Sequence, residues 1–336
     1  MLKSTSASLL LFFLLTHGCS NGEGVPSAPL KYRAGGGTPE KIAVYEAWFG
    51  HPRHISTGYS SHDPAILAEQ IRQAKADGIS AFVVDWYGDR EPFIDASYAE
   101  MQRVAASNHF QVAMMYDESD SEEDATDEAI ADFTVFHDTY LSSHAPGHQA
   151  YLTFDGRPVI FIFPKGGHTD WSKVRALIDK WNPAPFLIYE NLPAGSSANA
   201  FDGFYAWINP GQKGWAADGS NWGAQYLADF YETMKTKYPD KLIVGGAWAS
   251  FDDAKASWGL NRHISPRGGQ TLSDTVNFWR TEFPKDEPPP FLLIETWNDY
   301  EEGSAIERCI PSCDSAPHAP ASISFSKAAD SSSSKP

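Results

Sequence analysis

Residues 63–88, DPAILAEQIRQAKADGISAFVVDWYG, decide the fold class. The dipeptide Asp63-Pro64 has the form of a helix start, with Asp as the N-cap and Pro at the first helical position. Apolar residues then recur on one helical face, and the run 79–86 is β-branched and aromatic, as in a buried strand. This stretch therefore predicts a helix followed by a strand, the repeating unit of an α/β fold.

The same alternation continues along the chain. Strands are predicted at 42–48, 79–86, 111–116, 158–163, 186–190, 203–208, 242–248 and 291–297. Helices are predicted at 64–77, 97–107, 124–141, 171–181, 223–238 and 272–283. This order indicates an α/β fold of the (β/α)8 TIM-barrel type, and a doubly wound sheet is the alternative. We expect an irregular fifth connection, because 190–202 contains no good helix, and an incomplete eighth helix.

The two ends of the chain differ from this pattern. Residues 1–19 predict a signal peptide, because the apolar run 9–15 follows Lys3 and is too short to span a bilayer. Gly18-Cys19 also resembles a bacterial lipoprotein cleavage site, so a secreted protein and one anchored by lipid at Cys19 are both open. We expect a linker at 20–40, the barrel domain at 41–313 and a disordered tail at 314–336.

The composition limits the partners. Lys and Arg number 26 against 43 Asp and Glu, and the formal net charge of −17 argues against nucleic acid and anionic membranes. No later stretch approaches about 18 apolar residues, so no transmembrane segment is expected. Aromatic residues make up 13% of the chain, which fits either a large core or a cleft lined with rings. We expect a monomer.

The cysteine and histidine patterns favour neither a metal nor a cofactor. Cys309 and Cys313 remain after export, and such a pair in an oxidising compartment predicts a local disulfide. No second Cys/His pair stands at matching spacing, and the chain has no HExxH, GxSxG, GxGxxG or GxxxxGK[ST] motif. We therefore expect no metal and no cofactor.

Carboxylates stand beside aromatic rings where five of the eight predicted strands end. An acid that caps a helix and a ring in the core would explain any single pairing. The recurrence favours a cleft, because the chemistry of a barrel sits at this end of its strands. Acids bind sugar hydroxyls, rings stack on the apolar faces of pyranoses, and glycoside hydrolysis uses two carboxyl groups.

The segment 296–307, TWNDYEEGSAIE, resembles the glycoside hydrolase family 71 and family 99 group. Asn298-Asp299-Tyr300 is similar to family 71, the endo-α-1,3-glucanases. Glu302-Gly303 and Ile306-Glu307 are similar to family 99, the endo-α-mannosidases and mannanases, although Asp299 stands where family 99 has Glu. Weaker similarities extend over residues 41–307.

This resemblance implies a (β/α)8 enzyme that cleaves internal α-linkages of a polysaccharide, an α-1,3-glucan or an α-mannan. It implies Glu302 as the general acid, with a raised pKa, and Asp299 as the base, acting on water or on the substrate's own 2-hydroxyl. We expect Glu301 to be a solvated neighbour and Glu295 to point into the barrel. A non-catalytic glycan-binding barrel is the alternative function.

Ten further residues are candidates for holding sugars, because they stand at the predicted strand ends. They are Glu46, Trp48, Asp85, Trp86, Tyr116, Asp117, Glu190, Tyr205, Trp248 and Trp297.

Overall fold

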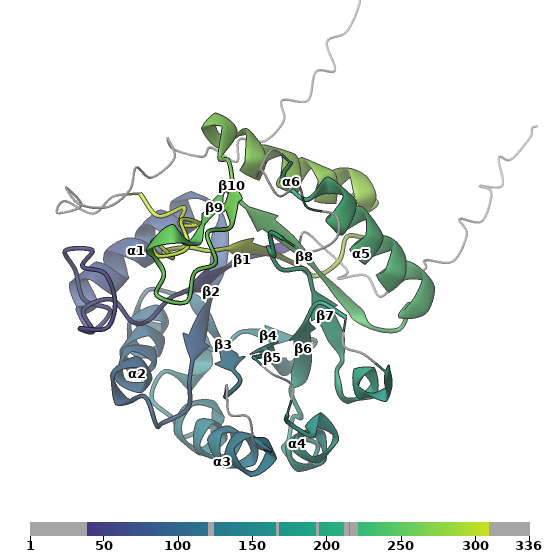
Figure 1. Cartoon of the computed structure of the whole chain (residues 1–336). Coiled ribbons are helices and arrows are strands. Elements are labelled where there is room, and N and C mark those ends of the chain that lie inside the picture. The colour runs from purple at the N-terminus through teal and green to yellow at the C-terminus, as the bar shows by residue number, and fades with distance from the viewer. Residues whose placement is uncertain are drawn as a thin grey trace, which may run out of the picture. The chain divides into compact units, whose positions relative to one another are not determined.

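The computed structural model describes residues 39–119, 124–165, 168–192, 195–211, 215 and 221–308. Eight parallel strands close into a barrel with helices around it (Figure 1). In order around the ring they are β1 (Glu40–Tyr45), β2 (Ile79–Trp86), β3 (Gln111–Asp117), β5 (Arg157–Phe163), β6 (Phe186–Glu190), β7 (Gly203–Tyr205), β8 (Leu242–Trp248) and β11 (Phe291–Glu295). Since β11 pairs with β1 in parallel, the predicted (β/α)8 barrel is confirmed and the doubly wound sheet is excluded.

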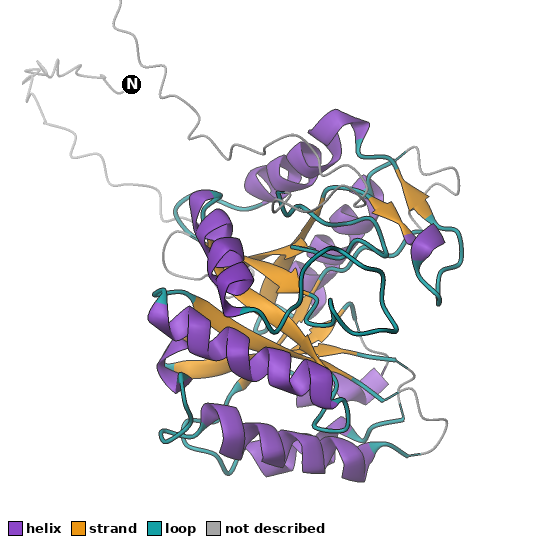
Figure 2. Ribbon diagram, turned by 90° about the vertical axis from the view of Figure 1, so that its left-hand side faces the viewer, coloured by secondary structure: helices purple, strands orange, loops and turns teal. Residues whose placement is uncertain are grey.

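Helices alternate with these strands and enclose them (Figure 2). They are α1 (Pro64–Ala76), α2 (Pro92–Ser107), α3 (Thr126–Phe136), α4 (Trp171–Ile178), α5 (Ala224–Lys237) and α6 (Gln270–Glu282). A π-helical turn, His137–Leu141, extends α3. The fifth connection, between β6 and β7, contains only the short 3-10 helix Gly195–Ala200, so its predicted irregularity is confirmed.

The helix predicted from residues 63–88 forms for the expected reasons. The Asp63 carboxylate accepts a hydrogen bond from the Ala65 N–H at 2.8 Å, and Pro64 begins the helix. Gly78 ends it with a φ of +75°, a conformation that favours glycine. Leu67 and Ile71 are buried, so this face packs α1 onto the barrel.

The short strand β7 and the last strand β11 end earlier than predicted. β7 ends at Tyr205 and β11 at Glu295, because the chain turns out of the barrel at these points. The Trp297 N–H then donates to the Val44 carbonyl at 2.7 Å. Trp297 is fully buried, with its ring centroid 5.2 Å from that of Phe82, so it packs in the core.

In the part of the chain that the structure describes, three further strands lie outside the ring. β4 (Thr153–Phe154) pairs antiparallel with β5. β9 (Phe251–Asp252) and β10 (His263–Ile264) form a small antiparallel hairpin after β8, and Figure 2 shows it set apart from the barrel strands. The hairpin therefore belongs to the loops that follow the C-terminal ends of the strands.

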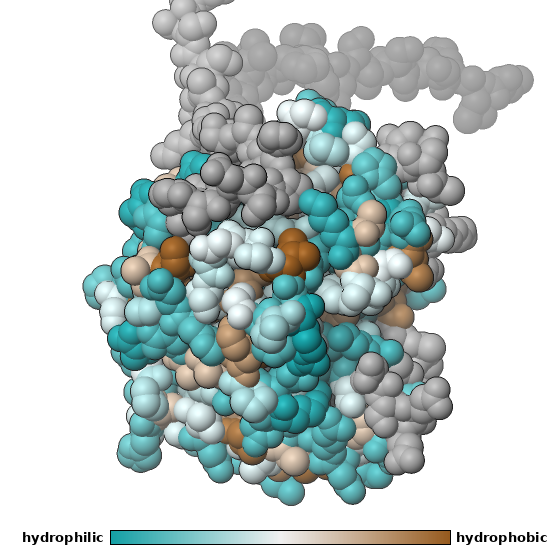
Figure 3. All heavy atoms as spheres, turned by 60° about the vertical axis from the view of Figure 1, so that its left-hand side comes forward, coloured by the Kyte–Doolittle hydropathy of each residue, from teal (hydrophilic) through white to brown (hydrophobic). Residues whose placement is uncertain are grey.

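The side of the molecule that carries α1 and α2 is largely hydrophilic, with apolar residues scattered over it (Figure 3). Within the described residues, no helix is both long and apolar enough to cross a membrane. The signal peptide, Cys19, the Cys309–Cys313 disulfide and the tail lie outside the described residues, as does the predicted linker up to residue 38. β1 begins at Glu40, the last residue of that linker.

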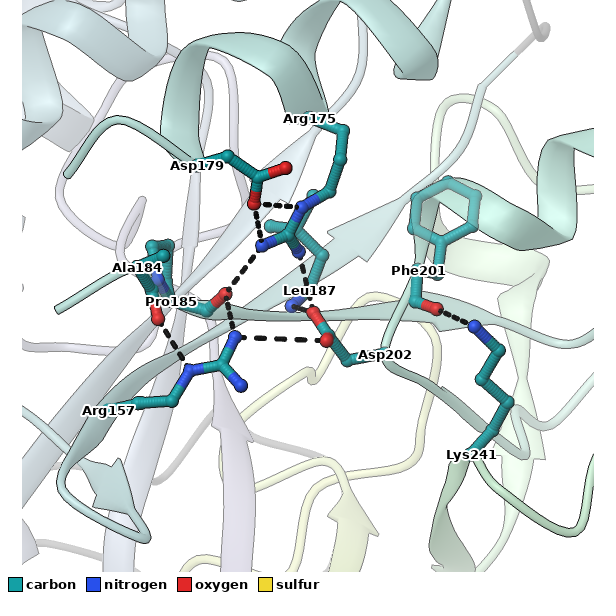
Figure 4. Close-up of polar contacts among 9 residues, drawn as sticks. All are labelled: Arg157, Arg175, Asp179, Ala184, Pro185, Leu187, Phe201, Asp202 and Lys241. Atoms are coloured by element: carbon teal, nitrogen blue, oxygen red, sulfur yellow. Dashed lines mark hydrogen bonds and ion pairs between the residues drawn. The ribbon is translucent and has the colours of Figure 1, made fainter. Parts of the chain in front are cut away.

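Asp202, which immediately precedes β7, anchors a polar network at the N-terminal ends of β5, β6 and β7 (Figure 4). Its Oδ2 accepts hydrogen bonds from the Leu187 N–H at 2.9 Å and from Arg175 at 2.7 Å. Arg157 donates to the Ala184 carbonyl at 2.6 Å and lies over the Phe186 ring. This network therefore ties three neighbouring strands and α4 together, at the end of the barrel opposite the strand-end loops.

We expect Asp202→Ala to lower the free energy of unfolding by about 2 kcal/mol, because it removes the acceptor of a backbone N–H and a partly buried guanidinium. The matched control is Asp179→Ala, which removes an exposed partner of the same arginine and should cost less than about 0.5 kcal/mol. Urea unfolding measures both. Equal losses for the two variants would show that Asp202 does not anchor the network.

Candidate active site

A cavity of about 560 Å³ opens at the C-terminal ends of the barrel strands. Its walls carry six carboxyl groups, from Glu46, Asp85, Glu91, Asp117, Asp299 and Glu302. Rings and cations lie beside these acids in the walls, from Trp48, Tyr87, Phe163, Trp207, Trp258, Arg53, His54, Lys165 and Arg262. The structure thus brings together the two predicted catalytic carboxyls and four of the ten predicted sugar-binding residues: Glu46, Trp48, Asp85 and Asp117.

The turn after β11 fixes Asp299. Its Oδ1 accepts hydrogen bonds from the backbone N–H groups of Glu301 at 2.9 Å and Glu302 at 2.8 Å. Its own N–H donates to Thr296 Oγ1 at 2.8 Å. Burial and the neighbouring Glu302 carboxyl raise the pKa of Asp299 well above its usual range. Oδ2 is therefore the oxygen left for the cavity.

Two side chains anchor this turn to the rest of the barrel. Asn298 bonds to both backbone groups of Glu46, accepting from its N–H at 2.7 Å and donating to its carbonyl at 3.0 Å. Glu307, fully buried, accepts from Tyr300 at 2.6 Å, Gln70 at 2.7 Å and Tyr59 at 2.9 Å. The position of the carboxyl pair is therefore set by contacts to β1, α1 and the loop between them.

Two opposing influences act on the pKa of Glu302: its burial and a hydrogen bond from a single donor. Its Oε1 accepts a hydrogen bond from the Trp258 indole N–H at 2.8 Å. Burial raises the pKa of Glu302, while the Trp258 hydrogen bond and the charge of Arg262 lower it. A carboxyl whose pKa is raised in this way can keep its proton closer to neutral pH.

Glu301 is buried, which corrects the expectation of a solvated neighbour. Its Oε2 lies 2.7 Å from His54 Nδ1, and its Oε1 accepts from the Ile55 N–H at 3.0 Å. His54 in turn stacks on Trp48, with ring centroids 4.6 Å apart and planes inclined by 6°. Glu301 therefore holds the cavity wall formed by the loop after β1.

Glu46 and Asp85 form a second carboxyl pair at the ends of β1 and β2. Their carboxyl groups hydrogen-bond to each other, which requires a shared proton. Burial, then the charge of Asp85 on Glu46 and of Asp117 on Asp85, raises the pKa of both well above the usual range. Glu46 Oε2 and Asp85 Oδ1 are buried and accept no hydrogen bond from any described residue.

Asp117, at the end of β3, pairs with Lys165. Lys165 Nζ lies 2.8 Å from Asp117 Oδ2, and the Tyr87 hydroxyl hydrogen-bonds to both Asp117 and Asp85. Burial raises the pKa of Asp117 to about 6, although Lys165 lowers it. Lys165 therefore favours the ionised form of Asp117 on this side of the cavity.

The other six predicted sugar-binding residues are not among those that line the cavity. Trp86, Tyr116, Tyr205, Trp248 and Trp297 are at most 1% exposed and serve core packing, which corrects their expected role as sugar platforms. Their polar atoms are also engaged: the Trp86 indole donates to Asp95 at 3.0 Å, and the Tyr116 hydroxyl donates to Asp132 at 2.8 Å. Glu190 is half-buried and accepts from Asn191 at 2.6 Å.

Strand alternation explains part of this difference. Side chains of a strand point alternately to its two faces, so Asp85 and Tyr87 face the cavity while Trp86 faces the helices. In the same way, Asp117 faces the cavity and Tyr116 faces the helices. Applied to the strand ends, this rule would have selected Tyr87 in place of Trp86. Lys165, Trp258 and Arg262 come from loops, where the sequence carries no comparable signal.

Glu295 points into the barrel, as expected. It is fully buried, and its Oε2 accepts from the Ile208 N–H at 2.5 Å. Burial raises the pKa of Glu295 well above its usual range. Among the described residues, no group of three or more His, Cys, Asp or Glu side chains has the arrangement of a metal site.

Comparison with solved structures finds proteins with a similar fold. Two structures of the GH99 endo-α-mannosidase from Bacteroides thetaiotaomicron, one in complex with Bis-Tris propane, superpose with TM-scores of 0.63 and 0.61. Both are 18% identical to this chain, over 82% of this chain and 89% of theirs. The fold is shared with the GH99 enzymes. The resemblance to the family 99 group expected from the sequence is thus confirmed at the level of the fold.

A glycoside hydrolase-like protein is similar too, with a TM-score of 0.60, 15% identity, and coverage of 84% of this chain and 90% of the other. No protein-family model and no curated protein sequence matches the chain.

The raised pKa values predict how stability depends on pH. Burial raises the pKa of Glu190 to about 8 and that of Glu307 to about 7. The folded protein keeps protons that the unfolded chain releases near pH 4.5, so the free energy of unfolding should fall as the pH rises from about 5 to about 8.

Glu190→Gln should flatten this decline, because the amide cannot titrate and can still accept from Asn191. Urea unfolding at four pH values across this range measures it. The control is the exposed Glu232→Gln on α5, which should leave the slope unchanged. A wild-type stability that rises over the same range would contradict the buried protonated acids.

Proposed function

We propose that this protein is an exported, endo-acting glycoside hydrolase that cleaves internal α-glycosidic bonds of a polysaccharide of the α-mannan or α-1,3-glucan type. In this proposal Glu302 is the general acid and Asp299 the base. The proposal is supported by the barrel shared with GH99 endo-α-mannosidase structures, the TWNDYEEG segment and the apolar N-terminal segment of the sequence.

One observation carries the proposal: two carboxyl groups with raised pKa values project from a single turn into the same cavity. Asp299 is held by two backbone N–H groups, and Glu302 by an indole N–H. The two groups differ in their partners, and different environments are what separates an acid from a base in a carboxyl pair.

The reaction balances as a hydrolysis. Glu302 gives its proton to the glycosidic oxygen as the bond from that oxygen to the anomeric carbon breaks, and the leaving sugar departs as an alcohol. Asp299 accepts a proton from the attacking water, whose oxygen bonds to the anomeric carbon. Attack by the substrate's own 2-hydroxyl, assisted by Asp299, is the other route, and water then opens the resulting ring. In both routes Asp299 needs its ionised form and Glu302 its protonated form.

The remaining walls of the cavity suit a neutral polyol. Glu46 Oε2, Asp85 Oδ1 and Asp117 Oδ1 are buried oxygens that accept no hydrogen bond from any described residue, and sugar hydroxyls are donors that would satisfy them. Trp48, Tyr87 and Trp207 contribute aromatic surface beside these acids. Glu46, Trp48, Asp85 and Asp117 are therefore proposed to bind the sugar chain.

We expect Glu302→Gln and Asp299→Asn each to reduce the rate of hydrolysis by about 100-fold to 10,000-fold, because each removes a positioned proton donor or acceptor. The substrates are α-mannan, α-1,3-glucan, dextran and starch, with released reducing ends counted and products sized. Products of intermediate length indicate internal cleavage.

Glu232→Gln, the same change on the exposed face of α5, should keep the wild-type rate, and circular dichroism checks that all variants fold. Activity should also persist in a chelator, because the proposed acid and base act without a metal. Near wild-type rates in both cavity variants would refute the assignment. A protein that retains a glycan but releases no reducing ends would instead be the non-catalytic binding barrel.

A further inference from the structure

The loop between β9 and β10 exposes two large apolar side chains, of which one lies at the cavity and the other does not line it. Trp258 is 44% exposed and Leu260 is 73% exposed, and no other large apolar side chain of the described residues is exposed to this degree. Trp258 also lines the cavity. Exposed apolar surface at the mouth of a cavity commonly marks a place where a ligand lies.

The loop is held in a defined conformation. Asp253, fully buried, accepts hydrogen bonds from the Leu260 N–H at 3.0 Å, the Arg262 N–H at 2.7 Å and the Arg262 guanidinium at 2.8 Å. At Gly259 a Cβ atom would come within 1.8 Å of the Asp253 carbonyl oxygen, so only glycine fits there. The exposure of Trp258 is therefore a feature of an ordered loop.

The same hairpin is joined to the turn that carries Glu302. The Asp252 N–H donates to the Glu302 carbonyl at 2.7 Å, and the Ser250 hydroxyl donates to the Gly303 carbonyl at 2.6 Å. The indole N–H of Trp258 adds the third link, to Glu302 Oε1 at 2.8 Å. Backbone and side chain thus both tie this ring to the proposed general acid.

The Trp258 ring is oriented by edge-to-face contacts with two other rings of the cavity wall. It meets Trp48 edge to face, with centroids 6.0 Å apart and planes inclined by 72°, and meets His54 in the same way at 6.3 Å. These contacts fix its orientation but leave much of its surface in the cavity. An indole N–H can only donate a hydrogen bond, so Oε1 acts as the acceptor and the acidic proton of Glu302 belongs on Oε2.

We propose that Trp258 forms the subsite for the departing part of the polysaccharide, stacking on the first sugar of the leaving group, and positions Glu302 with its proton on Oε2. This inference rests on the proposed hydrolase function and deepens it. Trp258 is a positioning residue: its N–H selects the oxygen that holds the proton, and its ring holds the sugar that receives it.

Removal of the indole N–H should raise the pKa of Glu302, because this hydrogen bond stabilises the ionised carboxyl. Other titratable and charged groups stand around the same carboxyl, in the cavity walls, in the hairpin or in its own turn. They are Glu46 after β1, His54 in the following loop, Lys165 after β5, Asp253 and Arg262 in the hairpin, and Asp299 and Glu301 in its own turn. All of these stay in place in the variants below.

The experiment uses Trp258→Phe, which keeps a ring and loses the donor, and Trp258→Ala, which loses both. On the polysaccharide that the wild type cleaves, Trp258→Phe should lower kcat by about tenfold with KM nearly unchanged, and move the basic limb of the pH–rate profile to higher pH. Trp258→Ala should in addition raise KM by about tenfold, through loss of the stacked sugar. The exposed neighbour Leu260→Ala is the control and should change kcat by less than about twofold.

A glycosyl fluoride with the sugar and anomeric configuration of the cleaved bond separates this role from a merely structural one. Fluoride leaves without a general acid and fills no leaving-group subsite, so both Trp258 variants should hydrolyse it within about twofold of the wild-type rate. Equal losses on fluoride and polysaccharide, or an unchanged pH profile in Trp258→Phe, would overturn the inference. A wild type inactive on both substrates would contradict the proposed function itself.

Discussion

The site depends on the way the turn after β11 is fastened to the start of the barrel. Asn298 bonds to both backbone groups of Glu46, and Glu307 accepts from Tyr59 in the loop after β1, Gln70 on α1 and Tyr300 in its own turn. The contacts with Glu46, Tyr59 and Gln70 join residues near the two ends of the described chain. They close the barrel at the end that carries the cavity, and the hydrogen bond from the Glu302 N–H to Asp299 adds a contact within the turn itself.

The three acidic side chains of this turn have different partners. Asp299 binds backbone N–H groups, Glu301 holds the His54 loop, and Glu302 meets Trp258. The arrangement places many acids where little water reaches them, and burial is the largest cause of each raised pKa in the cavity. Such a site has two consequences. The folded protein is less stable at high pH, and its carboxyl groups keep their protons near neutral pH.

Most of the fold could be predicted from sequence, because capped helices such as the one at Asp63-Pro64 and buried β-branched runs are local features. The closure of β11 on β1 is a long-range contact, and only the count of eight strands indicated it. In the site, position in the sequence predicts the acids at the strand ends, whereas Trp86 and Tyr116 can be assigned to the helix-facing side only when strand alternation is considered. Trp258 could not be found, since an exposed ring on a loop is recognised only when Glu302 lies beside it.

The account makes one central claim, that Asp299 and Glu302, two buried carboxyls with different hydrogen-bond partners, act as base and acid near neutral pH. The pH dependence of kcat/KM on the cleaved polysaccharide tests this most directly. The account predicts a bell-shaped profile whose two apparent pKa values belong to the coupled pair, with the lower one above the usual range of a carboxyl group. A profile that stays flat from acid to alkaline pH, or an enzyme most active where both carboxyls are protonated, would contradict it.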